Sequence, residues 1–255
     1  MFLIDNISPL GTCFEAFISE NSLSLRTTTS FIMQISDYII FQNHQFLVAN
    51  KPVGMPVQSD PTGDMPLITL LEQYCKVTLL PINRIDRPVS GLVLLAKTKA
   101  AAAHLNVQFS ERTATKYYLA ATKNAPTPTD AELVHFIRKG NTETNTSKAY
   151  LEQKPNTERA VLHYTTLGQS EVYTLLKIHL ITGRHHQIRA QLSAIGCPVK
   201  GDVKYGARRA NEDRSIHLHA WQIALTNPMT RERMVFEAPL PPNDPVWSAL
   251  LPLLG

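Results

Sequence analysis

Short apolar runs separated by turn residues predict the first strands of this chain. Residues 38–41 and 46–49 are apolar and flank the Asn43-His44 pair, which is typical of a β-hairpin. The following loop, residues 50–56, is held by two prolines and a glycine. Leu92–Ala96 is short, branched and unbroken, as expected of a strand that is buried in the core.

Further strands are predicted in the middle of the chain. Residues 115–121 form one of them. Residues 160–167 and 172–180 alternate between apolar and polar side chains, and we expect them to pair antiparallel through a turn at Gly168-Gln169. A later apolar segment, residues 216–225, is compatible with a strand or a helix.

Helices are predicted where apolar residues recur at helical spacing or where alanine is abundant. The segment that starts near His186 enters through a Thr-Gly turn and ends at Gly196. The other predicted helices are residues 67–75, 99–109 and 247–251.

Composition describes an ordinary globular protein. The 255 residues are 44% hydrophobic and 18% charged, enough for one large domain or two small ones. Three scattered cysteines argue against a disulfide framework or a cysteine-built zinc site and favour a reducing cytoplasm. No apolar run has the length of a membrane span, and no basic residue precedes Arg26, which argues against a secretory signal. We expect residues 1–30, rich in Ser and Thr, to be an N-terminal extension of residues 31–255.

Positive charge is concentrated in one part of the sequence. The net charge is +4, but between Lys177 and Arg214 eight Lys and Arg residues stand against three Asp and Glu residues. A basic sector on a nearly neutral protein fits a nucleic-acid footprint. The alternative is a solvated charged face without a partner.

Asp86 is the first candidate for chemistry. It lies between Arg84 and Arg87, and Pro88 places it on a loop that feeds the buried strand 92–96. The flanking guanidinium groups would favour the ionised carboxylate, which is a poor general acid but a usable nucleophile. The alternative is a surface loop in which the aspartate only pairs with a neighbouring arginine.

Two further segments carry candidate residues. Lys116 and Tyr118 share one face of the predicted strand 115–121, where they either pack in the core or form an aromatic platform for a base. Arg189 lies near the start of the helix after His186, where it could clamp a phosphate or pair with Asp86.

Four histidines were weighed as metal ligands, namely His185, His186, His217 and His219. The spacing H-E-x-x-H of a zinc hydrolase is absent, so we expect no metal. Histidines that contact RNA or are satisfied in the core are the favoured interpretation.

Taken together, three motifs resemble those of the RluA-type family of RNA pseudouridine synthases. They are Arg-Ile-Asp-Arg-x-x-Ser-Gly-Leu-Val-Leu-Leu-Ala-Lys, then Lys-x-Tyr-x-Ala, then Thr-Gly-Arg-x-His-Gln-Ile-Arg followed by Gly-x-Pro-x-x-Gly-Asp-x-x-Tyr-Gly. The resemblance covers roughly residues 37–240. It implies an α+β catalytic domain with a long, mainly antiparallel central sheet and an active-site cleft between two halves. It also implies a cofactor-free isomerase that replaces the N1–C1′ bond of uridine in RNA by a C5–C1′ bond.

The resemblance assigns roles to residues of this chain. Asp86 corresponds to the catalytic aspartate, Tyr118 to the tyrosine that stacks on the base and acts in C5 deprotonation, and Arg189 to the partner of the aspartate. Arg84 corresponds to an arginine that occupies the space left by the flipped nucleotide, and Leu218 to a wall of the uracil pocket. The expected RNA-binding residues are Arg84, Arg87, Lys116, Arg184, His186, Gln187 and Leu218.

Some positions depart from the family pattern, among them Asn83, Ile85, Val89 and His185. They leave the three catalytic groups intact but bear on which RNA is recognised. The expected partner is ribosomal or transfer RNA, and the protein is expected to be a monomer. The alternative function is a non-catalytic RNA-binding or ribosome-assembly factor on the same fold. Loss of Asp86 would be its signature, and Asp86 is present.

Overall fold

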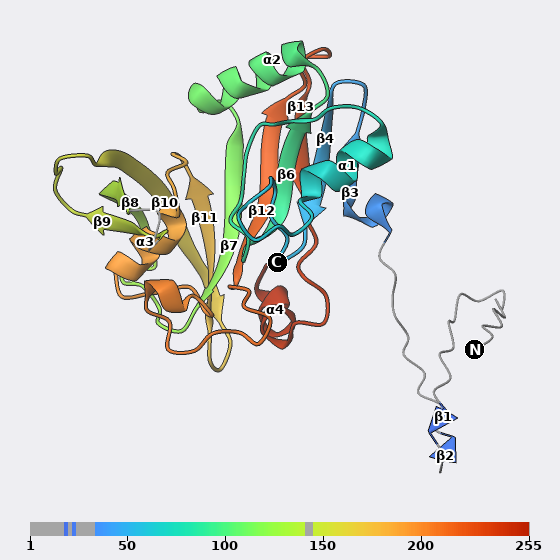
Figure 1. Cartoon of the computed structure of the whole chain (residues 1–255). Coiled ribbons are helices and arrows are strands. Elements are labelled where there is room, and N and C mark those ends of the chain that lie inside the picture. Colours follow the sequence, from blue (N-terminus) through green and yellow to red (C-terminus); the bar gives the residue numbers. More distant parts are fainter. Residues whose placement is uncertain (1–17, 20–21, 24–33, 141–144, 255) are drawn as a thin grey trace. The chain divides into compact units, whose positions relative to one another are not determined.

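A computed structural model describes residues 18–19, 22–23, 34–140 and 145–254 (Figure 1). The chain divides into two units, residues 1–34 and 35–255. In the first unit, β1 (Ile18–Ser19) pairs antiparallel with β2 (Ser22–Leu23). The expected N-terminal extension, residues 1–30, otherwise lies outside the described residues.

The second unit carries the remaining elements. Its strands are β3 (Ile39–Gln42), β4 (Phe46–Lys51), β5 (Leu80–Pro81), β6 (Ser90–Ala96), β7 (Thr115–Thr122), β8 (Asp130–Lys139), β9 (Ser147–Tyr150), β10 (Glu158–Gln169), β11 (Thr174–Leu180), β12 (Leu218–Thr226) and β13 (Arg233–Glu237). Its α-helices are α1 (Leu67–Cys75), α2 (Lys99–Ser110), α3 (Gln187–Ala194) and α4 (Pro245–Leu250). Short 3₁₀ helices cover η1 (Ile35–Tyr38), η2 (Val203–Tyr205) and η3 (Leu251–Leu254).

All strands of the second unit join one eleven-stranded sheet. Its order is β3-β4-β6-β12-β7-β11-β10-β8-β9, with β13 paired to β12 and β5 paired to β6. Neighbouring strands run antiparallel except β6 and β12, which are parallel. The predicted α+β fold with a long, mainly antiparallel central sheet is confirmed.

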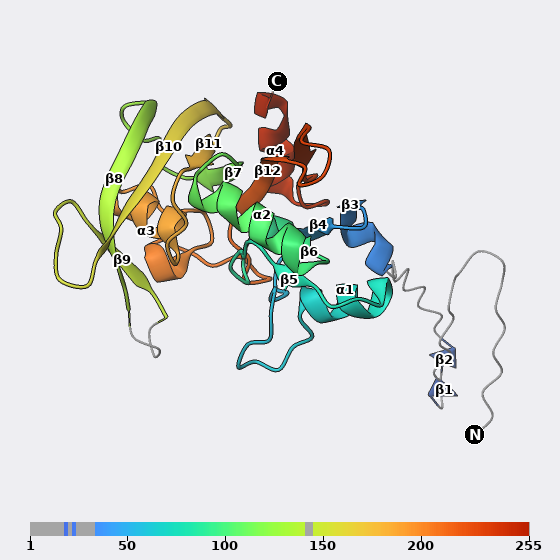
Figure 2. The same cartoon turned by 90° about the horizontal axis from the view of Figure 1, so that it is seen from above.

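Alternation along the strands gives the sheet two apolar faces. On β4, Leu47 and Ala49 pack in one buried cluster, and Phe46 and Val48 pack in another. The first face is covered by α1 and α3, and the second by α2 over β6 and β12 and by α4 over β7 and β11. Figures 1 and 2 show α3 beside β8 and β9, and α1 lies in the other half of the sheet, so the first face carries helices in both halves.

Most of the predicted elements are confirmed, one open alternative is decided, and one turn is corrected. The segment 216–225 is a strand, β12. The turn predicted at Gly168-Gln169 is wrong, because β10 continues through Gln169. The turn falls at residues 170–173, where the Tyr173 backbone amide donates a hydrogen bond to the Ser170 hydroxyl. Gly168 instead lies in the strand at a register shift, where an added Cβ would come within 3.0 Å of the Leu253 side chain.

Strands β8 and β13 were not predicted. β8 contains charged residues at both ends and buries only two of its ten residues fully, so its apolar pattern is weak. Among the described residues, no helix combines the length and the apolar character needed to cross a membrane.

Candidate active site

Asp86 lies on the loop immediately before β6, as predicted. Every residue of β6 is buried, and the Val89 amide donates to the Asp86 carbonyl at 3.0 Å, which closes a tight turn before the strand. Gly91 has φ of +111°, and a Cβ there would lie 2.3 Å from the Ala220 carbonyl oxygen. Only glycine allows β6 and β12 to approach this closely, so the loop is anchored on two core strands.

Lys51 supports this loop from inside the protein. Its side chain is fully buried, and its Nζ donates to the carbonyls of Pro52 and Met55 at 2.8 Å and of Arg87 at 3.2 Å. Burial lowers the pKa of Lys51 to about 7, against the opposing effect of Asp86. Lys51 was not selected as a site residue from the sequence, although the loop Asn50-Lys51-Pro52-x-Gly54 also resembles a feature of the family.

Arg189 joins Asp86 to a second carboxylate. Its Nη1 donates to Asp86 Oδ2 at 3.0 Å, while Nε and Nη2 bind Asp202 Oδ2 and Oδ1 at 2.6 and 2.8 Å. Burial opposes the charge, but the two carboxylates outweigh it and raise the pKa of Arg189. Of the two roles left open for Arg189, the structure therefore shows the pairing with Asp86. Asp202 was missed as a site residue, although it lies in one of the quoted motifs.

Tyr118 and Lys116 project from β7 on the same face, as predicted. Tyr118 is buried, and burial together with the negative charge of Asp86 raises its pKa, so the phenol is neutral at pH 7. Lys116 places its Nζ 5.2 Å from the centre of the Phe109 ring, and burial lowers its pKa to about 8. Leu218 of β12 lies opposite Ala120 and faces the same cleft.

His186 and Gln187 lie at the start of α3. His186 Nδ1 is 2.9 Å from the Tyr205 hydroxyl, its Nε2 is 3.4 Å from Asp86 Oδ2, and burial lowers its pKa to about 4. Gln187 is buried, and its side-chain amide is hydrogen-bonded within the protein. Its oxygen accepts from the Thr182 hydroxyl and from the Arg184 backbone amide, and its nitrogen donates to the Val161 carbonyl. Gln187 therefore positions the turn before α3, and the RNA contact expected of it stays a prediction.

The arginines beside Asp86 do not contact it. Arg87 pairs with Asp60 and Asp64, and Arg84 Nη1 donates to Gln58 at 3.5 Å. The alternative in which Asp86 only pairs with a neighbouring arginine is therefore wrong, because both arginine side chains bind other partners along the loop. The guanidinium that holds Asp86 comes from a helix about a hundred residues later, Arg189.

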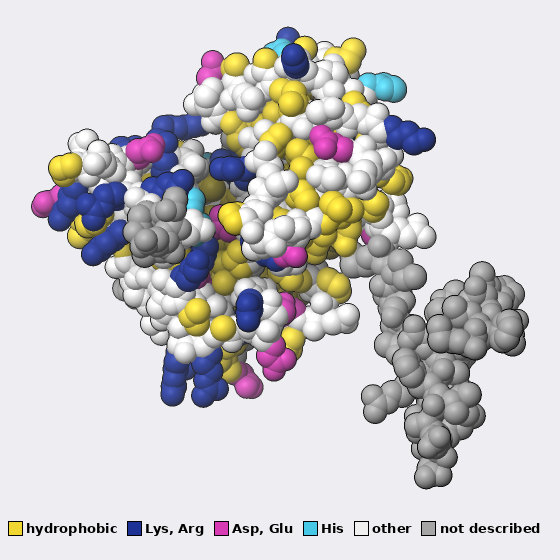
Figure 3. Space-filling model, viewed as in Figure 1, with side chains coloured by type: hydrophobic (Ala, Val, Ile, Leu, Met, Phe, Trp, Pro, Cys, Tyr) yellow, Lys and Arg dark blue, Asp and Glu magenta, His cyan; other side chains and the backbone are white. Residues whose placement is uncertain are grey.

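One cleft of about 1340 Å³ collects all ten residues selected from the sequence. Its walls carry eight cations against three carboxylates, a surplus suited to a polyanion. The cations are Arg84, Arg87, Lys116, Lys139, Arg184, Arg189, Lys204 and Arg214, and the carboxylates are Asp60, Asp86 and Asp213. Figure 3 shows Lys and Arg side chains gathered on the lobe of β8, β9 and α3 and around the hollow beside it.

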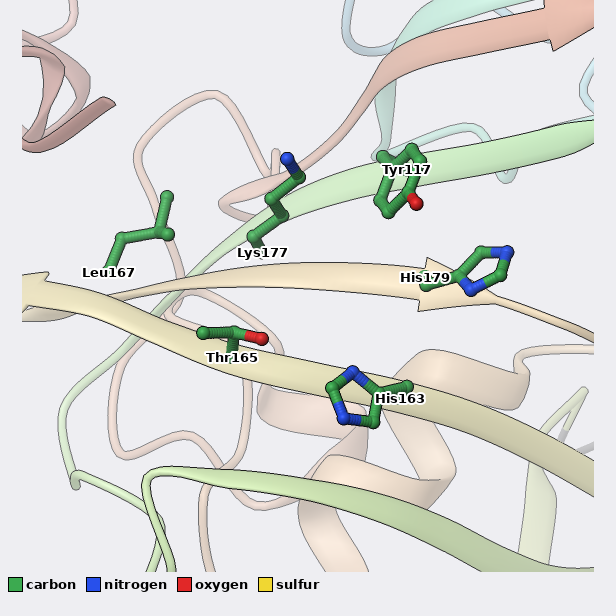
Figure 4. A pocket seen from close by; sticks show the side chains of 6 residues that line it. All are labelled: Tyr117, His163, Thr165, Leu167, Lys177 and His179. Carbon is green, nitrogen blue, oxygen red and sulfur yellow. The ribbon is translucent and has the colours of Figure 1, made fainter. Parts of the chain in front are cut away.

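A second, smaller hollow lies on the opposite face of the sheet. It has a volume of about 360 Å³ and is lined by Tyr117, His163, Thr165, Leu167, Lys177 and His179 (Figure 4). Lys177 belongs to the basic sector of the sequence, but it faces this hollow and not the cleft. The sector therefore does not form one continuous surface.

The four histidines fall into two places. His185 stacks on His186 in the cleft, with ring centres 3.8 Å apart. His217 pairs with Asp244, and His219 Nδ1 lies 2.8 Å from the Ser90 hydroxyl. The described residues contain no group of three or more His, Cys, Asp or Glu side chains that could hold a metal ion.

Comparison with known proteins identifies the family. The family model described as RNA pseudouridylate synthase matches residues 45–194, more than half of the chain. The chain belongs to the RluA-type RNA pseudouridine synthases. This synthase is therefore an isomerase that converts uridine in RNA to pseudouridine.

Relatives and solved structures agree with this family. The synthase is 31% identical to the ribosomal large subunit pseudouridine synthase C of Vibrio vulnificus, over 82% of this chain and 67% of that protein. It is 32% identical to an uncharacterized RNA pseudouridine synthase of Bacillus subtilis, over 80% and 69% of the two chains. The structure of human RNA pseudouridylate synthase domain containing 1 superposes with a TM-score of 0.69 at 26% identity, covering 84% of this chain and 87% of that one. The synthase thus spans about two thirds of these two bacterial relatives.

Proposed function

We propose that this synthase isomerises specific uridines of ribosomal or transfer RNA, with Asp86 as its catalytic carboxylate. The observation that carries the proposal is the meeting of Asp86, Arg189 and Tyr118 in one cation-lined cleft. These groups come from a loop, a helix and a strand that are far apart in the sequence. The name of the Vibrio vulnificus relative favours ribosomal RNA over transfer RNA.

The proposed reaction exchanges one bond to the ribose for another. The N1–C1′ bond breaks with its electron pair moving to the uracil, and the Asp86 carboxylate stabilises or bonds the electron-poor C1′. The uracil then turns, C5 bonds to C1′, the C5 proton leaves and N1 gains a proton. No water enters the product, so one carboxylate is enough, and no cofactor is required.

Tyr118 and the cations supply recognition in this proposal. The target nucleotide has to leave its stack, which costs a few kcal/mol, and an aromatic ring that stacks on the extruded base offsets part of that cost. Tyr118 stacks on the extruded uracil as a neutral phenol, Leu218 forms the apolar wall of the pocket, and Arg84 fills the gap in the RNA. Lys116, Arg87 and Arg184 line the same cleft and grip neighbouring phosphates. We place the protein in the cytoplasm, where its RNA substrates are found. We expect it to act as a monomer.

The test is release of tritium from RNA labelled at C5 of uridine. Total RNA from cells that lack the protein serves as substrate, and we expect release by the wild type and none by Asp86→Ala. Asp213→Ala removes another carboxylate of the cleft wall and is expected to keep release.

Two outcomes would contradict the proposal. Wild-type release by Asp86→Ala would exclude Asp86 as the catalyst. No release by the wild type, with identical pseudouridine maps of RNA from cells with and without the protein, would instead support the non-catalytic RNA-binding factor.

A further inference from the structure

The hydroxyl of Tyr205 determines which nitrogen of His186 carries a proton. Its oxygen accepts the backbone amide of Ser147 at 2.7 Å and lies 2.9 Å from His186 Nδ1. A phenol has one proton to donate, and within the described part of the chain Nδ1 is its only hydrogen-bonding acceptor. Nδ1 therefore accepts, and the proton of the neutral imidazole lies on Nε2.

The ring of His186 is held in this orientation from two sides. His185 stacks on it at an interplanar angle of 22°, and His185 Nδ1 is in turn 2.9 Å from the Ser147 hydroxyl. The Tyr205 ring meets it edge-on, with ring centres 5.7 Å apart. Only 7% of the His186 side chain is exposed, so there is little room for the ring to flip.

Nε2 lies 3.4 Å from Oδ2 of Asp86, close to the carboxylate but not hydrogen-bonded to it in the free protein. This oxygen already accepts Arg189 Nη1 at 3.0 Å. In the part of the chain that the structure describes, Asp86 Oδ1 accepts no hydrogen bond, and the side chain is 29% exposed in the cleft. The two oxygens of Asp86 are therefore not equivalent.

The surroundings keep His186 uncharged. Burial is the main cause, and the positive charge of Arg189 and the nearby His185 and Lys204 act in the same direction, against the attraction of Asp86. An N–H donor without charge can bind Oδ2 while adding no second positive charge beside the carboxylate.

The geometry points to a positioning role for His186, which holds Asp86 for reaction and does not contact the RNA. Its Nε2–H donates to Asp86 Oδ2 when RNA fills the cleft, and together with Arg189 it leaves Oδ1 as the oxygen that meets the ribose. The 3.4 Å separation in the free protein shortens in the complex, as catalytic hydrogen bonds do on substrate binding. This inference rests on the proposed function of Asp86 and assigns a new role to His186 and Tyr205.

The first test reads the tautomer directly. In the full chain labelled with ¹⁵N-histidine, long-range proton–nitrogen spectra distinguish protonated from unprotonated ring nitrogens, and the His186 signals are assigned by their loss in His186→Gln. We expect the Nε2–H tautomer at pH 7 in the wild type. Tyr205→Phe keeps the ring but removes the hydroxyl, and should give a mixture of tautomers. An Nδ1–H tautomer or an imidazolium in the wild type would overturn the inference.

The second test compares two amides at position 186. The amide nitrogen of Gln reaches the place of Nε2, whereas that of Asn reaches only the place of Nδ1. We expect His186→Asn to slow single-turnover tritium release at least ~10-fold with unchanged RNA affinity, because misplacing a catalytic group can cost up to ~10²-fold. His186→Gln should stay within ~3-fold of the wild type.

Folding of both variants is checked by thermal unfolding. Equal losses in both folded variants, or weaker RNA binding with unchanged turnover, would overturn the positioning role. If the wild type releases no tritium at all, the proposed function fails, and the nitrogen spectra still decide where the proton lies.

Discussion

The cleft and the hollow on the opposite face draw on the same strand, β7. Lys116 and Tyr118 face the cleft, while Tyr117 faces the hollow, where Lys177 Nζ lies 4.8 Å from the centre of its ring. Each place offers a tyrosine and a lysine, but only the cleft has a carboxylate, Asp86, that is paired with a buried arginine. The carboxylate next to the hollow, Asp130, binds His163 and Thr165. A cation and an aromatic ring on a strand are therefore not enough to make a catalytic site.

The two places also differ in how their charges are held. In the cleft, Arg189 and Asp202 are almost completely buried and bind each other through two hydrogen bonds. In the hollow, Lys177 is partly exposed and rests on the rings of Tyr117 and Trp221. Buried pairs are costly to break, whereas exposed cations contribute little, so we expect the charges of the cleft to matter more for stability than the cation of the hollow.

The largest expected effect follows from that contrast. Arg189→Met leaves the buried Asp202 carboxylate without its partner and should lower the free energy of unfolding by about 3–5 kcal/mol. Lys177→Met removes only a cation beside aromatic rings and should cost about 1 kcal/mol or less. Urea unfolding followed by circular dichroism measures both. Equal losses would show that the buried network does not stabilise the cleft.

The second comparison concerns the two tyrosines of β7. Tyr118→Phe should retain RNA binding but slow single-turnover tritium release by roughly 10²-fold, since it removes a hydroxyl beside the reacting groups. Tyr117→Phe changes the hollow and should leave the rate unchanged. Loss of RNA affinity in Tyr118→Phe would mean that Tyr118 docks the RNA, and a slow Tyr117→Phe would bring the hollow into the reaction.

The smallest effect is a dependence of stability on pH. Folding lowers the pKa of His186 from 6.5 to about 4, so the unfolded chain binds more protons than the folded one in this window. The contribution to stability is complete above pH 6.5 and is lost as pH falls toward 4, roughly 1 kcal/mol between pH 7 and 5.5.

Replacing the histidine tests this assignment. His186→Gln should flatten the acid side of the curve of unfolding free energy against pH. Burial also lowers the pKa of His179 in the hollow, but by less, so His179→Gln should flatten the curve less. Denaturant unfolding at a series of pH values provides the curves, and the reverse order would contradict the comparison.

Local patterns in the sequence determined the elements that place the site. The buried run 92–96, the helix 67–75 and the alternation of Lys116 and Tyr118 on β7 each follow from neighbours in the chain. Strand β8 escaped prediction because its stability comes from pairing with β9 and β10, which no local pattern reveals. The candidate residues themselves were found through motifs, and all of them line one cleft.

Part of the network around those residues was decided only by the tertiary structure. The motifs indicated Arg189 as the partner of Asp86, and the structure has this pair. Only the fold shows that Asp202 in turn holds Arg189, and that Arg84 and Arg87 bind other side chains. Adjacent side chains on an extended loop point in different directions, whereas a long-range fold can bring a guanidinium from a helix onto a carboxylate from a loop. The chain therefore specifies by itself which chemical groups are present, and the sheet with its covering helices selects which of them meet.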